Sequence, residues 1–170
     1  MRHVMAGLAV GLGLSLACSV YAKDVTVSEK SFGCIRDGTK IRNTYIKNAD
    51  PAKLKEAVRI LKDRVPDKEY PVGTFLQLVP FEVMVKHPRA KFPDTNGWEF
   101  FALDLSEKGA TIKSRGDKTV NFQGVPCMSC HQPAAKFDFV CEKGHGCAPL
   151  PFDDQKIAEL QGEDPRCPKK

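Results

Sequence analysis

The chain has 170 residues, which is long enough for one domain with a modest hydrophobic core. Its formal net charge is +5 and its basic residues are spread along the sequence, so nucleic acid is not expected as a partner. A weakly positive surface still suits an acidic redox partner protein or an anionic substrate.

The N-terminus is typical of a secretory signal peptide. An almost wholly apolar run over residues 4–20 precedes a segment of small residues that ends at Ala22, as signal peptidase sites do. The run is slightly short for a membrane-spanning helix. We therefore predict a signal peptide over residues 1–22, a single mature domain over residues 23–170, a periplasmic location and no transmembrane span after cleavage. Lipoprotein anchoring at Cys18 is the alternative.

Cysteine is the most informative residue type in this sequence. Six cysteines remain after the predicted cleavage, and an oxidising compartment favours their use in pairs. Two of the six belong to the motif described below. Cys141 and Cys147 enclose a short glycine-containing loop that can close without much strain, which leaves Cys34 and Cys167 to join the two ends of the domain. We predict disulfides in these two pairs.

Local patterns predict an α+β fold, with a small antiparallel β-sheet and a few flanking helices. Residues 23–47 are expected to form an irregular lead-in that holds a short strand at most. Asp50 and Pro51 begin a helix that Pro66 ends. Further elements are expected as strands over residues 73–87 (divided at Pro80), 97–105 and 110–114, and a short helix over residues 153–160.

Residues 127–131, Cys-Met-Ser-Cys-His, form the C-x-x-C-H pattern of covalent haem attachment. The spacing allows the thiols of Cys127 and Cys130 to reach the two vinyl groups on one edge of the porphyrin, with His131 as the proximal iron ligand. A redox-active dithiol would usually open a helix in a parallel βαβ unit, and a zinc site would need a second ligand pair. We therefore predict one covalent haem c, attached near the C-terminus.

The sequence from residue 70 to residue 140 resembles the cytochrome P-460 family, which includes cytochrome c′-beta. The resemblance lies in the segments 73–75 and 97–101 and in the haem motif with its continuation to Val140. It implies an antiparallel sheet covered by helices, a proximal histidine, often a homodimer, and a haem that binds nitric oxide or oxidises hydroxylamine. The namesake enzymes carry a strand lysine cross-linked to the haem, and Leu78 occupies that position here in ungapped register. We expect no such cross-link.

The iron is predicted to be five-coordinate, because no methionine follows the haem motif. Phe75, Leu78 and Phe81 are expected to contribute to an apolar distal pocket, which suits a small neutral ligand such as nitric oxide. Lys86 is the nearest lysine downstream of Leu78 and would need a different register to reach the haem.

Other candidates for the sixth ligand or for proton transfer have simpler explanations. We expect Met84 in the core, His87 in a solvent-exposed turn and His145 in a surface loop closed by a disulfide. Glu99 and Asp104 are expected to face solvent.

The sequence thus predicts a periplasmic monohaem cytochrome that binds a small gaseous or nitrogenous ligand, for example nitric oxide. Two alternatives remain open. One is an electron-transfer cytochrome with six-coordinate haem, and the other is an oxidoreductase that acts on hydroxylamine or another nitrogen compound.

Overall fold

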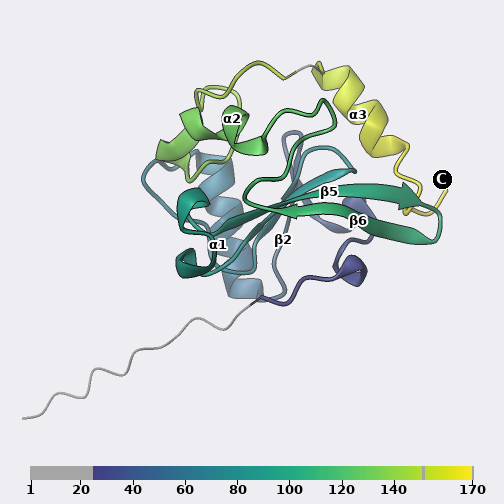
Figure 1. The fold of residues 1–170 in the computed structure, drawn as a ribbon, viewed down its shortest axis with the longest axis horizontal. Coiled ribbons are helices and arrows are strands. Elements are labelled where there is room, and N and C mark those ends of the chain that lie inside the picture. Colours follow the sequence, from purple (N-terminus) through teal and green to yellow (C-terminus); the bar gives the residue numbers. More distant parts are fainter. Residues whose placement is uncertain (1–24, 151, 170) are drawn as a thin grey trace, which may run out of the picture.

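A computed structural model of the chain describes residues 25–150 and 152–169. The predicted signal peptide and Cys18 lie outside these residues. Within them the chain forms a six-stranded antiparallel sheet flanked by three α-helices and several short 3-10 helices, which is the α+β fold that the sequence predicts (Figure 1). No helix among the described residues has both the length and the apolar character needed to cross a membrane.

The strands lie in the sheet in chain order, so each neighbouring pair is also consecutive in the sequence. They are β1 (Thr39–Ile41), β2 (Thr44–Lys47), β3 (Phe75–Gln77), β4 (Glu82–Lys86), β5 (Trp98–Ser106) and β6 (Gly109–Gly116). The α-helices are α1 (Pro51–Asp63), α2 (Cys127–His131) and α3 (Asp154–Gly162). The 3-10 helices are η1 (Glu29–Ser31), η2 (Ile35–Asp37), η3 (Arg89–Lys91), η4 (Pro93–Thr95) and η5 (Gln132–Phe137).

Helix α1 begins where the sequence predicts. The Asp50 carboxylate caps the first turn by accepting two backbone N–H bonds at 2.9 and 3.2 Å, and Pro51 occupies the first helical position. Ala57, Ile60 and Leu61 are buried and join the hydrophobic core on one face of the sheet.

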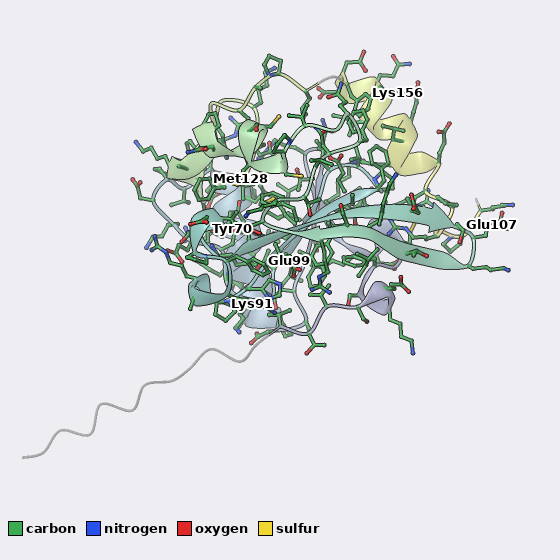
Figure 2. The ribbon with its side chains drawn as sticks, in the orientation of Figure 1. Tyr70, Lys91, Glu99, Glu107, Met128 and Lys156 are labelled. Carbon is green, nitrogen blue, oxygen red and sulfur yellow. A yellow bond between two sulfur atoms is a disulfide. The ribbon has the colours of Figure 1, made fainter. Side chains whose placement is uncertain are left out.

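Apolar side chains cover both faces of the sheet, because successive residues of a strand point to opposite sides. One face carries the core beneath α1 and α2, with Ile46, Leu76, Met84, Trp98, Phe100 and Val140. Tyr70 and Met128 belong to this core, and Figure 2 shows both. The opposite face packs against the N-terminal segment through Val27, Phe32, Val83, Val85, Phe101 and Leu103.

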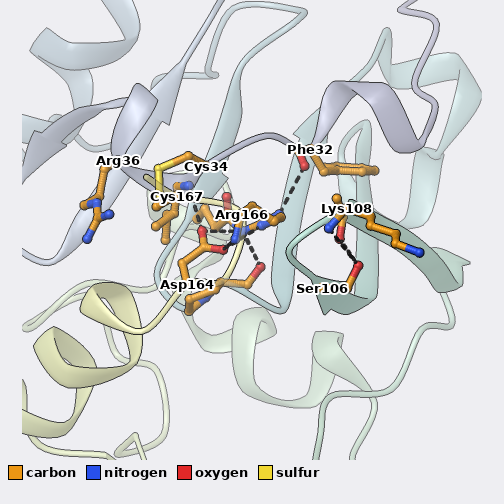
Figure 3. Close-up of polar contacts among 12 residues, drawn as sticks. Phe32, Cys34, Arg36, Ser106, Lys108, Asp164, Arg166 and Cys167 are labelled. Atoms are coloured by element: carbon orange, nitrogen blue, oxygen red, sulfur yellow. Dashed lines mark hydrogen bonds and ion pairs between the residues drawn. A yellow bond between two sulfur atoms is a disulfide. The ribbon is translucent and has the colours of Figure 1, made fainter. Parts of the chain in front are cut away.

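The C-terminal segment is fastened to the N-terminal segment. Cys34 and Cys167 form a disulfide, with their Cα atoms 4.6 Å apart. Next to it, the buried side chains of Arg166 and Asp164 form an ion pair with 2.8 Å between Nε and Oδ1 (Figure 3). Arg166 also donates to the carbonyl oxygen of Pro80, at 3.0 Å, in the connection between β3 and β4. The two ends of the domain are therefore joined as the sequence predicts.

The N-terminal lead-in is more regular than expected. Residues 39–47 form the β1–β2 hairpin, in which Ile41 pairs with Thr44. None of the side chains of β1 is buried, so this strand has no alternation of apolar and polar residues that the sequence could reveal.

Candidate haem site

A cavity of about 170 Å³ lies between the sheet and the haem motif. Cys127, Cys130 and His131 of α2 all line it. Strands β3, β4 and β5 supply most of the facing wall, with Leu76, Met84 and Phe100 among the lining residues. Two further walls come from the loop before α2 and from the segment before α3, through Asn121, Phe122, Gln123, Ala148, Pro149, Leu150 and Phe152.

The two motif cysteines are free thiols in this structure. Burial raises the pKa of the Cys127 thiol to about 12, and the nearby Glu82 carboxylate adds to the increase. Redox-active dithiols depend on the opposite effect, a thiol pKa below its usual value. The surroundings of Cys127 therefore argue against a thioredoxin-type function for this motif.

The His131 ring is held in a defined orientation. Its Nδ1 lies 2.7 Å from the carbonyl oxygen of Phe139, so Nδ1 carries the proton and donates it, which leaves Nε2 as the ligand atom. The ring also meets that of Phe100 edge-on, with centroids 5.0 Å apart. Burial lowers the pKa of His131 and outweighs the bond to Phe139, which favours the neutral imidazole that metal binding requires.

The predicted distal residues lie in three different places. Leu78 lines the cavity. Phe81 lies behind the wall and packs edge-on against Phe122, with ring centroids 5.6 Å apart. Phe75 points to the opposite face of the sheet, where its ring centroid is 6.3 Å from that of Phe32. The expectation for Phe75 was wrong, because Phe75 alternates along β3 with Leu76, which faces the cavity.

His87 and Glu99 are buried, contrary to the expectation that both face solvent. His87 is 0% exposed, and its Nε2 lies 2.8 Å from Oε2 of Glu99. Arg115 of β6 reaches the same carboxylate, with 2.6 Å between Nε and Oε1. Arg115 thus provides the counter-charge that permits burial of Glu99, and only the β5–β6 register brings them together. Asp104 is exposed, as expected.

His145 is also buried, although the disulfide between Cys141 and Cys147 forms as predicted. Its Nδ1 lies 2.7 Å from the carbonyl oxygen of Val140, and its ring stacks on that of Phe137 with centroids 3.8 Å apart. His145 therefore fixes the loop against the end of η5, and it does not line the cavity.

Glu82 lines the cavity and was missed by the sequence reasoning. Its Oε1 accepts a hydrogen bond from the backbone N–H of Phe122 at 2.9 Å, and burial raises the pKa of its carboxyl. A strand over residues 82–86 would have placed Glu82 on the same face as Met84, so alternation was the available signal.

The chain matches a known family. The sequence model described as Cytochrome P460 matches residues 18–142, which include the haem motif and its continuation to Val140. No curated protein and no solved structure gives a significant match. The matched residues end before Ala148, so the cavity wall that precedes α3 lies outside the family pattern.

Proposed function

Because the chain belongs to the cytochrome P460 family of haem proteins, we propose that it is an exported, periplasmic cytochrome with one covalent haem c. Cys127 and Cys130 hold the haem, and His131 ligates its iron on the proximal side. The iron is five-coordinate and binds a small ligand such as nitric oxide. The observation that supports this proposal is the convergence of two free thiols and one oriented imidazole on the same cavity.

The residues present fit a haem. The thiols of Cys127 and Cys130 are the groups that form thioethers, and His131 offers a neutral imidazole nitrogen. When bound, the haem would supply an iron centre able to bind a small ligand. Leu78, which occupies the position of the cross-linking lysine in ungapped register, lines the cavity with an alkyl side chain, and this supports attachment without the cross-link of the namesake enzymes.

The walls favour a small neutral ligand over polarised dioxygen, which needs a hydrogen-bond donor. Leu76, Leu78 and Phe100 give the cavity apolar surfaces on the side of the sheet. Two of the polar side chains on the sheet side of the cavity are already engaged; the amide side chains of Asn121 and Gln123 also line it, from the loop before α2. Gln77 Nε2 donates to a backbone oxygen at 2.6 Å, and the Thr44 hydroxyl donates to a carboxylate at 3.0 Å.

Each alternative function has one supporting observation. Met84 lines the cavity from β4, so its thioether favours the electron-transfer alternative with six-coordinate iron. Glu82 lines the same cavity with a carboxyl of raised pKa, which favours an oxidoreductase that must move protons from a nitrogen compound.

Haem attachment is the test of the proposal. We expect periplasmic protein, produced together with a cytochrome c maturation system, to retain one haem per chain after acid–acetone extraction. Intact mass should equal the mature chain plus one haem with two thioether bonds. Replacing Cys127 or Cys130 by Ala should prevent normal attachment, whereas the control Cys141→Ala/Cys147→Ala should keep the haem. Haem that extracts freely from the wild-type protein would refute the proposal.

A further inference from the structure

The carbonyl group that orients His131 stands in a strained turn. Phe139 accepts the bond from His131 Nδ1, and both Asp138 and Phe139 have positive φ angles, of 54° and 59°. Aspartate tolerates this left-handed conformation, but a bulky residue such as phenylalanine does so only when its surroundings impose it. The orientation of the Phe139 carbonyl therefore depends on whatever holds this turn.

Asp138 holds the turn through hydrogen bonds to four residues elsewhere in the fold. Both of its carboxylate oxygens accept from Lys86 Nζ, at 2.7 and 2.8 Å. The same carboxylate accepts from Asn96 Nδ2 at 2.6 Å and from the backbone N–H of Tyr70 at 2.8 Å. The Asp138 carbonyl oxygen accepts from Trp98 Nε1 at 2.7 Å.

The ion pair at the centre of this arrangement is fully buried, with side-chain exposures of 2% for Lys86 and 1% for Asp138. Removing two charges from water is costly, so a buried pair is an inefficient way to gain stability compared with apolar side chains. Lys86 lies on the cavity face of β4, two residues after Met84, yet its ammonium group is directed to Asp138. Because its partner Asp138 directly precedes Phe139, whose carbonyl oxygen accepts from His131, the ion pair is in a position to set the geometry of that histidine.

We propose that Lys86 is a positioning residue for the proximal iron ligand. Its ammonium group fixes the Asp138 carboxylate, and the turn that Asp138 anchors directs the Phe139 carbonyl to Nδ1 of His131. The hydrogen bond from Nδ1 to a carbonyl increases the basicity of the imidazole and fixes its ring orientation. The inference rests on the proposed function, since it concerns the ligand that His131 provides.

The deciding measurement is the Fe(II)–His stretching frequency, recorded by resonance Raman spectroscopy on purified holoprotein. Lys86→Met and Asp138→Asn should both lower this frequency, because the turn relaxes and the bond to His131 weakens in each. Lys86→Arg, which keeps the cation, should restore most of the wild-type value. The reduction potential is a poorer readout, because the two variants change the local charge in opposite directions.

The matched control is Arg166→Met, which breaks the equally buried Arg166–Asp164 pair without touching the haem motif. It should destabilise the protein and leave the frequency unchanged. An unchanged frequency in Lys86→Met, or an equal shift in Arg166→Met, would overturn the inference. If Lys86→Met does not fold, Asp138→Asn, which removes the charged partner of Lys86, is judged against Arg166→Met by the same criteria.

Failure of the inference can be distinguished from failure of the proposed function. If the wild-type protein carries no covalent haem, the proposed function is wrong. If the ferrous iron proves six-coordinate, the NMR resonance of the His131 Nδ1 proton replaces the Raman band, with a shift expected in Lys86→Met and none in Arg166→Met.

Discussion

The rings of Phe122 and Phe152 are stacked, with centroids 5.1 Å apart and planes at 17°. Phe122 precedes the haem motif, whereas Phe152 precedes α3, and both residues line the cavity. Phe122 also contacts Phe81, so three aromatic rings in a row connect the β3–β4 connection to the C-terminal segment. Phe152 lies beyond the residues that match the family model, which end at residue 142.

The first prediction is that Phe152 limits access to the cavity. Phe152→Ala should increase the association rate of a bulky iron ligand such as imidazole more than that of nitric oxide. Loss of the aromatic pair should reduce the free energy of unfolding by about 0.5–1.5 kcal/mol in addition to the loss of buried apolar area. Stopped-flow binding measures the rates, and Phe152→Leu, which keeps an apolar wall, is the control. Equal imidazole rates in wild type and Phe152→Ala would show that this segment does not restrict entry.

The second prediction concerns the two disulfides, which close loops of very different length. Cys34 and Cys167 are separated by 133 residues in sequence, and Cys141 and Cys147 by 6. In the loop-entropy model, removing the long-range bond should lower the free energy of unfolding by about 5 kcal/mol, and removing the short one by about 2 kcal/mol. Urea unfolding of the two double Cys→Ser variants tests this difference.

The long-range disulfide should also affect the cavity. Gln161 of α3 donates to the Leu78 carbonyl oxygen at 2.7 Å, and Arg166 donates to that of Pro80 at 3.0 Å, so the C-terminal segment supports the β3–β4 connection. Without the bond from Cys34 to Cys167, imidazole should bind faster.

For the stability prediction, an equal decrease in the free energy of unfolding in both double Cys→Ser variants would contradict the entropic explanation.

The third prediction is a pH dependence that arises at Asp164. Burial alone would raise the pKa of this carboxyl, but hydrogen bonds from Arg166 and from the backbone N–H of Ile35, at 2.9 Å, outweigh burial and lower the pKa. An aspartate with a lowered pKa in the folded state stabilises the fold above about pH 4, the unfolded value, and this stabilisation is lost as the pH falls through the folded value.

Asp164→Asn should therefore lower the free energy of unfolding at pH 7 by about 3 kcal/mol, because it leaves the buried Arg166 without its counter-charge. Below pH 4, the free energy of unfolding of the variant should also change less with pH than that of the wild type. Urea unfolding between about pH 2 and pH 7, the range in which carboxyls titrate, measures this dependence. Asp104→Asn is the control, since the Asp104 side chain is 68% exposed. If the free energy of unfolding changes with pH in the same way in Asp164→Asn and in the wild type, Asp164 is not the source of the pH dependence.

The features that the sequence predicted correctly are those carried by short stretches of chain. The Asp50 cap and the strand that begins at Trp98 are both local. The two disulfides could be predicted because, once Cys127 and Cys130 were assigned to the haem motif, only four cysteines remained to be paired. By contrast, the Lys86–Asp138 pair joins residues 52 positions apart and depends on how η5 packs against β4. Alternation along the strand suggested that Glu99 faces solvent, and its partner Arg115, which lies on another strand, could not be identified from local sequence.

The last prediction concerns the sixth coordination position of the iron. Two upstream candidates are now clearly separated by the structure. His87 is completely buried and bonded to Glu99 on the face of the sheet opposite the cavity, so it cannot reach the iron without refolding of β4. Met84 is 7% exposed and lines the cavity. Met84 is therefore the residue whose replacement distinguishes a ligand-binding cytochrome from an electron carrier.

We expect the ferrous protein to show a five-coordinate, high-spin optical spectrum and to bind nitric oxide readily. Met84→Leu should leave this spectrum unchanged, because leucine conserves the volume of the side chain and costs less than about 1.5 kcal/mol in a packed core. His87→Ala is the control, since it disturbs the opposite face of the sheet and should not alter the spin state. A low-spin ferrous spectrum in the wild type that becomes high-spin in Met84→Leu would instead establish Met84 as an iron ligand, and the electron-transfer alternative would replace the ligand-binding function.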